Sequence, residues 1–184
     1  DLPRPADLPG GQVLLYAGTV HPDRVDVDLL VDTARAVDGR ARVVLLGPQL
    51  LARPDTDRLA AAGVVLLGPR PAREVPAYLV HADVLLVPHV VDAFTASLDP
   101  IKRYEYAAAG RPIVATAVSG FLDGVALTAP HSEFPALAGA VLADPGMAPD
   151  PSWAAAEADW SIRVGAMAEV LGRLPTTRRD RMAE

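Results

Sequence analysis

Short, continuous apolar runs recur along the first two thirds of the chain. The five clearest runs lie at residues 13–18, 42–47, 63–68, 83–88 and 111–116. They are rich in valine and leucine and do not alternate with polar residues. Strands that are covered on both faces have this pattern, which favours a parallel sheet. A sixth strand around residues 125–129 is expected to complete the sheet.

Helical patterns separate the apolar runs. Residues 26–37 place apolar side chains on one face, residues 73–82 give a shorter helix, and residues 132–143 give a later one. Strands that alternate with helices in this way form right-handed βαβ units. The expected fold class is therefore α/β, with an open, doubly wound parallel sheet of about six strands.

The clearest helix signals lie between the fourth and fifth strands, over residues 99–109. Asp99 is predicted to be the N-cap, Pro100 the first helical residue, and Gly110 the residue just past the end. Lys102, the single lysine among 17 basic residues, then falls in the first turn. A cation there is unfavourable by roughly 0.3–1 kcal/mol because it faces the positive end of the helix dipole. A bound anion would explain its position.

The two ends of the chain differ from its middle part. Residues 1–11 hold three prolines and two glycines without an apolar period, so we predict a linker from a missing N-terminal domain. Residues 12–150 form the predicted domain. Residues 151–184 are expected to be a C-terminal helix and tail that pack on it; the alternative is that part of the helix faces an absent second domain. The chain begins with Asp, and we expect a fragment cut at a domain boundary.

Composition limits the classes of function. A chain of 184 residues, 51% of them hydrophobic, can bury one sizeable core. The absence of cysteine excludes disulfides, and the four histidines lack zinc-ligand spacing, so no metal site is predicted. The net charge of −6 argues against nucleic acid as the main partner. No apolar run approaches the ~20 residues of a membrane helix, and a cytoplasmic location is expected.

Ligands of an open parallel sheet bind outside the carboxyl ends of its strands. Those ends are predicted at Gly18-Thr19, Gly47-Pro48, Gly68 to Arg70, Pro88-His89 and Thr116. Glycine at three of these ends either leaves room for a ligand or only makes a tight turn. Neither the dinucleotide-binding glycine pattern nor the P-loop pattern occurs.

Lys102 and Glu105 make the sharpest candidate site. Lys102 can reach forward over the free N–H groups at the helix start, where an anion binds favourably. Glu105 lies about 60° round the helix, where its carboxylate could accept hydrogen bonds from ribose hydroxyls while Lys102 holds phosphates. The alternative is an ordinary surface ion pair worth about 0.2–0.5 kcal/mol.

The segment "DPIKRYEYAAAGRPIVAT" resembles the donor site of GT-B glycosyltransferases of the family 4 type, in which the pattern reads roughly S-P-x-K-x-x-E-Y-x-A-x-G-x-P-V-V-A-T. Upstream, "LLYAGTVHPDRVDVDLL" and "GVVLLGPRPAREVPAYLVHADVLLVPH" are similar to segments of the same family in the same order. The resemblance covers about residues 12–120, and the rest more loosely. It implies a Rossmann-like domain, namely the C-terminal, nucleotide-sugar-binding half of a two-domain GT-B fold.

The resemblance also implies roles for individual residues. Lys102 and Arg24 would hold the diphosphate and act as catalytic residues by stabilising it as it leaves. Glu105 would hold the ribose. These three residues would thus bind the part of the donor that stays behind when the sugar is transferred.

Further donor-binding positions follow from the same resemblance. The loop with Arg70 would lie near the base, and backbone amides around Ser97 and Leu98 near the phosphates. Gly18-Thr19 would close the site from the other side. His89 is the last candidate, for which a plain surface histidine is the alternative.

Two positions depart from the family pattern. Many relatives have a glutamate that contacts the sugar where this chain has Ser97, eight residues before Glu105. Asp99 stands where serine is common, and as an N-cap its carboxylate would compete with a diphosphate for the helix N–H groups. The expected recognition of the sugar, and to a lesser degree of the phosphates, is weakened accordingly.

The leading hypothesis is the donor domain of a hexosyltransferase that moves a sugar from a UDP- or GDP-sugar to an acceptor, with retention and with no required cofactor. The fragment alone is expected to be inactive, because the acceptor would bind mainly to the missing N-terminal domain. Peripheral membrane association of the full enzyme is a further expectation. The alternatives are a sugar-nucleotide epimerase of the same architecture and a non-catalytic nucleotide-binding module.

Overall fold

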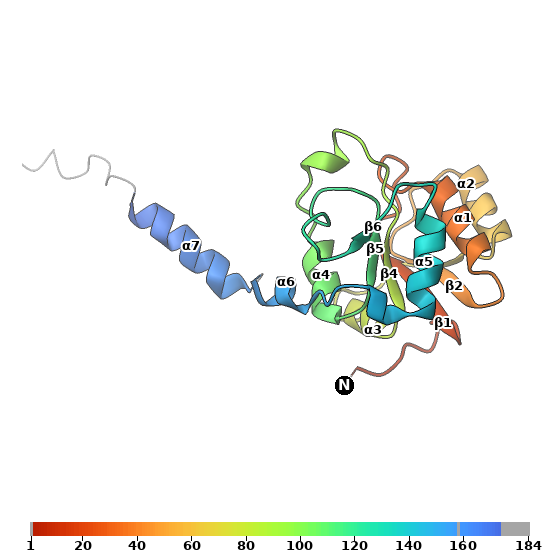
Figure 1. The fold of residues 1–184 in the computed structure, drawn as a ribbon, viewed down its shortest axis with the longest axis horizontal. Coiled ribbons are helices and arrows are strands. Elements are labelled where there is room, and N and C mark those ends of the chain that lie inside the picture. Colours follow the sequence, from red (N-terminus) through yellow and green to blue (C-terminus); the bar gives the residue numbers. More distant parts are fainter. Residues whose placement is uncertain (1, 158, 174–184) are drawn as a thin grey trace, which may run out of the picture.

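A parallel sheet forms the centre of the computed structural model, which describes residues 2–157 and 159–173. The strand order is β3-β2-β1-β4-β5-β6, and every pairing is parallel (Figure 1). The strands are β1 (Gln12–Ala17), β2 (Ala41–Leu46), β3 (Val65–Gly68), β4 (Val84–Val87), β5 (Ile113–Ala115) and β6 (Leu127–Thr128). The predicted α/β class with six strands is confirmed.

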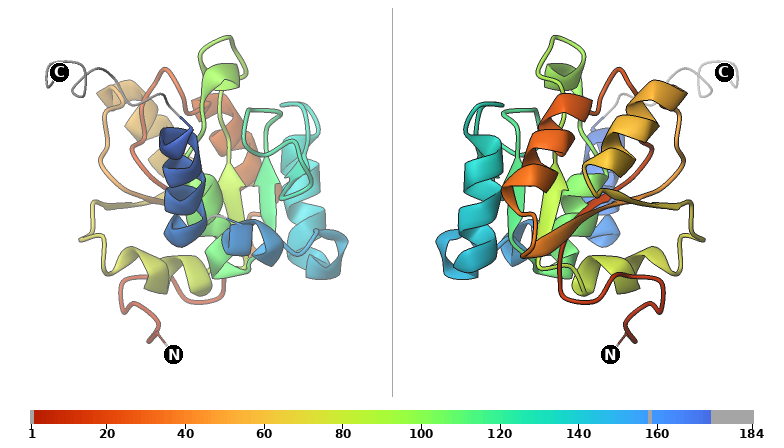
Figure 2. Two further views of the ribbon diagram at one scale, coloured as in Figure 1. Left: turned by 90° about the vertical axis from the view of Figure 1, so that its left-hand side faces the viewer. Right: turned by 90° about the vertical axis from the view of Figure 1, so that its right-hand side faces the viewer.

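Helices cover both faces of the sheet (Figures 1 and 2). One layer contains α1 (Val27–Ala36), α2 (Arg53–Ala61) and α5 (Phe134–Ala143), and the other contains α3 (Val75–Val80), α4 (Lys102–Ala109) and α6 (Ser152–Glu157). The side chains of β1 alternate between the two layers. Leu14 packs with the first layer and Leu15 with the second, and both are fully buried. Burial on both faces explains why the apolar runs are continuous.

Two helices differ from the prediction. The sequence pattern does not reveal α2, because its residues are mostly polar and only Leu59 is buried. The prediction that Asp99 caps α4 is wrong: no side chain caps this helix, and Asp99 Oδ1 instead accepts a hydrogen bond from the Tyr104 hydroxyl at 3.2 Å. The predicted end of α4 is confirmed, since Gly110 adopts the left-handed conformation with a φ of 63°.

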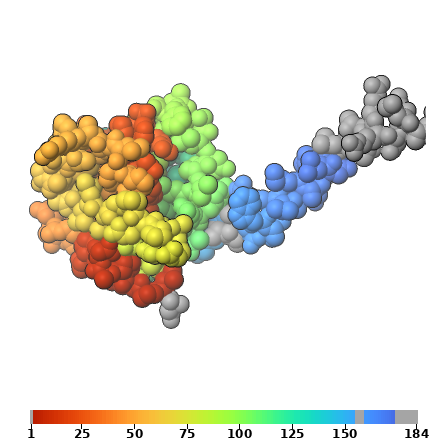
Figure 3. Space-filling model, turned by 180° about the vertical axis from the view of Figure 1, so that it is seen from behind, coloured from red at the N-terminus to blue at the C-terminus, as the bar shows by residue number. Residues whose placement is uncertain are grey.

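The C-terminal part forms two helices where the sequence predicts one. α6 packs against α4 and buries Ala154. α7 (Trp160–Gly172) projects from the domain, and its apolar side chains are exposed, from 56% at Ile162 to 77% at Trp160 (Figures 1 and 3). The packing of residues 151–184 on the domain stays a prediction, and its residues 158 and 174–184 lie outside the described part. No described helix is long and apolar enough to span a membrane.

Short elements and contacts complete the domain. Two 3₁₀ helices, η1 (Thr95–Ser97) and η2 (Pro145–Met147), lie in the connections after β4 and α5. The segment 2–11 runs beside the second helix layer, where Leu8 is buried and the Asp7 carboxylate accepts a hydrogen bond from Tyr78 at 2.7 Å. Its assignment as a linker stays a prediction.

Candidate functional site

The strand order reverses between β1 and β4, and this switch point is where ligands of such sheets bind. Gly18 follows β1 with a φ of 141°, and Gly47 follows β2 with a φ of 142°. A Cβ on Gly47 would lie 2.1 Å from the carbonyl oxygen of Gly18, so only glycine lets these loops meet. At the ends of β1 and β2, this edge of the sheet is therefore formed by backbone atoms and not by side chains.

The loop between β1 and α1 is tied to the end of β4. The Asp26 N–H donates to the Pro88 carbonyl at 2.9 Å, and the Val90 N–H donates to the Arg24 carbonyl at 2.8 Å. Val25 and His89 form an antiparallel bridge between the same segments. These contacts place Arg24 beside His89, 65 positions further along the chain, at the switch point.

Lys102 reaches the same place from the opposite helix layer. Its Nζ lies 3.5 Å from the centroid of the Tyr16 ring and 2.9 Å from where a Cβ on Gly18 would be. A side chain at position 18 would therefore collide with the ammonium group. Within the described part of the chain, neither Lys102 nor Arg24 makes an ion pair or donates a side-chain hydrogen bond. Two unpaired cations thus meet at the switch point.

The pKa of Lys102 reflects this environment. Burial holds the pKa of its ammonium well below the usual value, and the charge of Arg24 lowers the pKa further, whereas the charge of Glu105 raises it. A positive charge that is desolvated and lies near a second cation is unfavourable. A bound anion would relieve both penalties.

Two neighbours of Lys102 stay neutral. Burial, followed by the charges of Lys102 and Arg24, lowers the pKa of His89 to about 3. Burial raises the pKa of Tyr16 to about 12. The Tyr16 hydroxyl donates to the Thr19 carbonyl at 3.1 Å, and His89 Nε2 lies 3.5 Å from the same hydroxyl. At neutral pH, His89 and Tyr16 therefore add no charge to the site, and its charged or basic groups are Lys102, Arg24 and Glu105.

This anion-attracting switch point agrees with the comparison to known protein families. The family described as glycosyl transferases group 1 matches residues 11–143, which is most of the chain. The chain belongs to this family. A search of curated proteins finds no match.

Solved glycosyltransferase structures share the fold of this group 1 chain. Anabaena HepE, in complex with UDP and glucose, superposes with a TM-score of 0.72 at 17% identity, over 89% of this chain and 49% of HepE. WaaG, from lipopolysaccharide biosynthesis, gives 0.67 at 17% identity, over 88% and 47%. The trehalose-phosphate synthase of Burkholderia vietnamiensis gives 0.68 at 15% identity, over 89% and 45%. The domain is a GT-B glycosyltransferase domain that spans about half of these chains.

Tyr106 fixes α4 of the group 1 domain against the switch point. Its ring is fully buried, and its oxygen accepts a hydrogen bond from the Ala17 N–H at 2.8 Å while its hydroxyl lies 3.4 Å from the Leu86 carbonyl. The end of β1 and the end of β4 are thus both bonded to one helix. This contact sets how far Lys102, one turn earlier, extends over the edge of the sheet.

Arg103 anchors the first turn of α4 from the other side. Its guanidinium donates to Asp123 at 2.8 Å and 2.5 Å and to the Gly120 carbonyl at 2.6 Å. Gly120 also packs so closely that a Cβ there would lie 2.8 Å from Pro100 Cδ. The sequence pattern does not reveal this pair, because its bidentate geometry joins residues 20 positions apart.

Three predicted site residues are held by other contacts. Arg70 pairs with Asp7 and donates to the Tyr78 hydroxyl at 3.1 Å, and it follows β3, two strand spacings or roughly 10 Å from β1. The Ser97 hydroxyl and N–H both donate to the Phe94 carbonyl, within η1. Leu98 follows in extended conformation. The structure therefore brings Gly18, Thr19, Arg24, His89 and Lys102 together, with Glu105 on the same helix, and leaves Arg70, Ser97 and Leu98 at the margins.

No cluster of three or more His, Asp or Glu side chains among residues 2–157 and 159–173 has a metal-binding arrangement. The charges that these residues offer a ligand at the switch point are the two cations and Glu105. A nucleoside diphosphate matches that set, because it combines an anion with hydroxyl groups that can donate hydrogen bonds to a carboxylate.

Proposed function

We propose that this chain is the C-terminal, donor-binding domain of a family 4 type glycosyltransferase. The full enzyme moves a sugar from a nucleotide diphosphate sugar to an acceptor, with retention of the anomeric configuration. The observation that carries the proposal is the meeting of Lys102 and Arg24, unpaired within the described residues, at the switch point of a group 1 domain. The missing half of the GT-B fold supplies the acceptor site.

In this proposal the cations act on the leaving group. Lys102 and Arg24 bind the diphosphate in the ground state, and their charge stabilises the additional negative charge that develops on the diphosphate as the bond from the anomeric carbon to its oxygen breaks. Gly18 lets the phosphates approach the backbone, and neutral His89 lines the same space. The Lys102 ammonium regains its ordinary pKa once the phosphate is present.

Glu105 and the margin residues bind the nucleoside. The carboxylate of Glu105 is exposed on α4 and accepts hydrogen bonds from the ribose hydroxyls. Arg70 contacts the base after exchanging its bond to Asp7, and backbone amides near Ser97 and Leu98 meet the phosphates. UDP is the first nucleotide to test, since HepE is complexed with UDP and the trehalose-phosphate synthases are UDP-forming.

Calorimetric titration of the chain with UDP, GDP and ADP tests the proposal. One nucleotide should bind, and Lys102→Ala and Glu105→Ala should each weaken it by about 1–3 kcal/mol. Arg42→Ala, a cation on β2 paired with Asp38, is the matched control and should bind like the unaltered chain. Loss of binding in the control, or no binding of any nucleotide, contradicts the proposal.

Product analysis with the full-length enzyme separates the remaining alternatives. A transferase releases the nucleoside diphosphate and links the sugar to an acceptor, whereas an epimerase returns an isomerised nucleotide sugar. Neither product would indicate the non-catalytic module. The isolated domain should transfer nothing, since it has no acceptor half.

A further inference from the structure

The amine of Lys102 lies against groups that offer it no hydrogen-bond acceptor. Its Nζ is 3.5 Å from the centroid of the Tyr16 ring and 5.8 Å from that of the Tyr106 ring. An aromatic face attracts a cation, but it replaces only part of the strong hydration of an ammonium group. Among the residues that the structure describes, no side-chain or carbonyl oxygen accepts a hydrogen bond from this amine. The three N–H donors of a protonated Lys102 therefore have no partner in this part of the chain.

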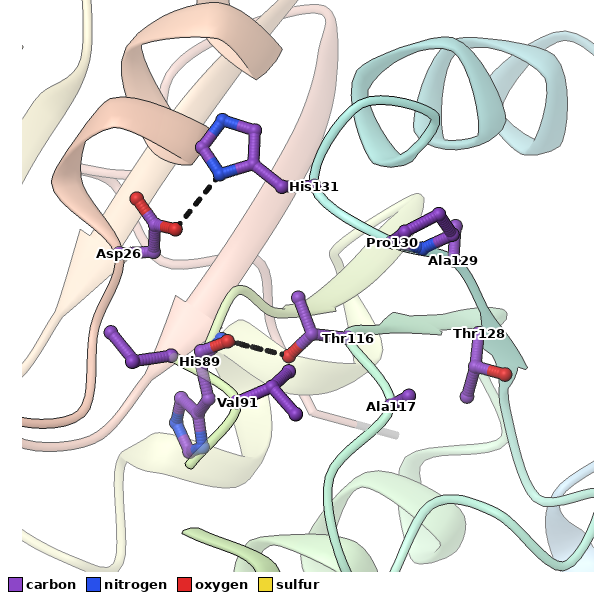
Figure 4. Close-up of a pocket in the computed structure, with 10 residues that line it drawn as sticks. Asp26, His89, Val91, Thr116, Ala117, Thr128, Ala129, Pro130 and His131 are labelled. Carbon is purple, nitrogen blue, oxygen red and sulfur yellow. Dashed lines mark hydrogen bonds and ion pairs between the residues drawn. The ribbon is translucent and has the colours of Figure 1, made fainter. Parts of the chain in front are cut away.

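The carboxylates of the neighbouring β1–α1 loop are held away from the amine. Asp23 is exposed. Asp26 caps α1 with one carboxylate oxygen, and its other oxygen lies 2.9 Å from Nδ1 of His131 (Figure 4). Within the described residues, neither carboxylate forms an ion pair with Lys102 or Arg24. The loop that brings Arg24 to the switch point thus supplies a second cation but no counter-ion.

Two charged groups remain around the amine, and they act in opposite directions. Burial holds the pKa of Lys102 well below its usual value; the charge of Glu105, on the same helix, raises the pKa, and the charge of Arg24 lowers it. One favourable and one unfavourable charge leave the cost of desolvating the ammonium largely uncompensated. The surroundings of Lys102 therefore favour the neutral amine.

The other titratable groups beside Lys102 are neutral rings. Burial raises the pKa of Tyr16 to about 12 and that of Tyr106 well above its usual value. Burial lowers the pKa of His89 to about 3. The His89 backbone is fixed by Thr116, whose hydroxyl donates to the His89 carbonyl at 2.7 Å and accepts from its N–H at 3.2 Å (Figure 4). None of these rings can neutralise a charge on Lys102 near neutral pH.

We propose that the Lys102 amine takes up a proton when the donor diphosphate binds, so that donor affinity falls as the pH rises. The phosphate oxygens supply both the hydrogen-bond acceptors and the negative charge that the protein does not. The proton moves from solvent to the lone pair of Nζ, and no covalent bond forms between protein and ligand. This inference rests on the proposed function, because it needs a diphosphate at Lys102.

The direction of the pH effect follows from the difference in bound protons. As the pH rises through the range in which the free domain loses the Lys102 proton, a growing fraction of molecules must regain it in order to bind. The dissociation constant should therefore rise, by up to about tenfold per pH unit. The terminal phosphate of a nucleoside diphosphate does not contribute above about pH 7.5, because a phosphate group of this kind loses its second proton with a pKa of about 6.

Calorimetry in buffers of different ionisation enthalpy counts the protons. The probe is UDP, or GDP if GDP is the nucleotide that binds, at several pH values from about 7.5 to 9.5. The unaltered chain should take up protons, never more than one for each bound nucleotide. Lys102→Arg keeps a cation that does not titrate in this range and should bind without proton uptake. Arg42→Ala, on β2, should take up as many protons as the unaltered chain. Binding without uptake by the unaltered chain, or equal uptake by Lys102→Arg, would overturn the inference.

The titration of Lys102 can also be followed directly. Because the sequence holds a single lysine, labelling lysine with ¹³C at Cε gives one NMR resonance. Its midpoint should lie below the ordinary value of about 10.4 in the free domain and should rise when the nucleotide is bound. An ordinary midpoint in the free domain, or one that binding leaves unchanged, would refute the proton uptake and leave the donor site intact. Failure of every nucleotide to bind would instead refute the donor site, and the proton uptake with it.

Discussion

Lys102 and Arg103 are adjacent cations in the first turn of α4, yet their surroundings are opposite. Arg103 is bound by both oxygens of Asp123 and by a carbonyl, and these bonds raise the pKa of its guanidinium. Lys102 lies against an aromatic ring without a counter-ion in the described chain, and burial lowers its pKa. Removing one partner of a satisfied buried pair is destabilising because it leaves an uncompensated charge, whereas an unsatisfied buried charge costs stability and is typical of a functional site.

The largest effect is expected from substituting Arg103, the cation whose charge is paired. Arg103→Ala should lower the free energy of unfolding by about 2–3 kcal/mol, because Asp123 and the Gly120 carbonyl lose their partner. The loss stays below that of a fully buried pair because Asp123 is half-exposed. Urea unfolding measures it. Arg35→Ala, which breaks an exposed pair with Asp32, should change stability by less than about 0.5 kcal/mol; equal losses in the two variants would contradict the comparison.

Substitution of Lys102, the cation without a counter-ion in the described chain, should not lower the free energy of unfolding, in contrast to substitution of Arg103. Lys102→Met keeps the length and apolar stem of the side chain but removes the desolvated charge. The free energy of unfolding should therefore stay unchanged or rise, while nucleotide affinity falls at least about tenfold. Urea unfolding and calorimetry on the same preparation give both values. If Lys102→Met destabilises the domain as much as Arg103→Ala does, Lys102 is a structural residue and not a ligand-binding one.

The pH dependence of stability tests a further buried group beside Lys102, the His89 imidazole. Its pKa is about 3 in the folded domain and about 6.5 when unfolded, so between these values the unfolded chain binds more protons. Stability from the neutral imidazole is therefore lost as the pH falls from about 6.5 towards 3. The slope reaches about 1.4 kcal/mol per pH unit. His89→Gln should unfold with a shallower pH dependence over this window, measured by thermal unfolding at pH 4 to 7; parallel profiles would contradict the buried neutral histidine.

The sheet could be predicted from sequence because its strands are buried on both faces and therefore read as uninterrupted apolar runs. α2 could not, because a helix that buries only Leu59 leaves no periodic pattern. The start of α4 was misplaced for a related reason: Asp99 and Pro100 have the residue types of a helix start, but Asp99 bonds Tyr104 instead. The residue types therefore predict that a helix lies here, but the hydrogen-bond partners of the side chains determine at which residue it begins.

The candidate site divides in the same way. Lys102 and Glu105 share one helix, and Arg24 follows a strand end, so sequence spacing and resemblance point to them. The Asp26–His131 pair joins residues 105 positions apart, and only the close approach of the β6 end to the start of α1 creates it. The anchor between Arg103 and Asp123 is equally non-local. Interactions of this kind depend on tertiary geometry, which no pattern along the chain encodes.

The smallest expected effect concerns the ring beneath Lys102. Tyr16→Phe keeps the aromatic face 3.5 Å from the ammonium and loses the hydroxyl's bond to the Thr19 carbonyl and its 3.5 Å contact with His89 Nε2, so nucleotide affinity should stay within about twofold. Tyr16→Leu removes the ring and with it a cation–π interaction of about 0.5–1 kcal/mol, so Lys102 is less well positioned and affinity should fall about two- to fivefold. Calorimetry at one pH compares the three proteins. An equal loss in both variants would mean that the hydroxyl, and not the ring, holds Lys102 ready for the phosphate.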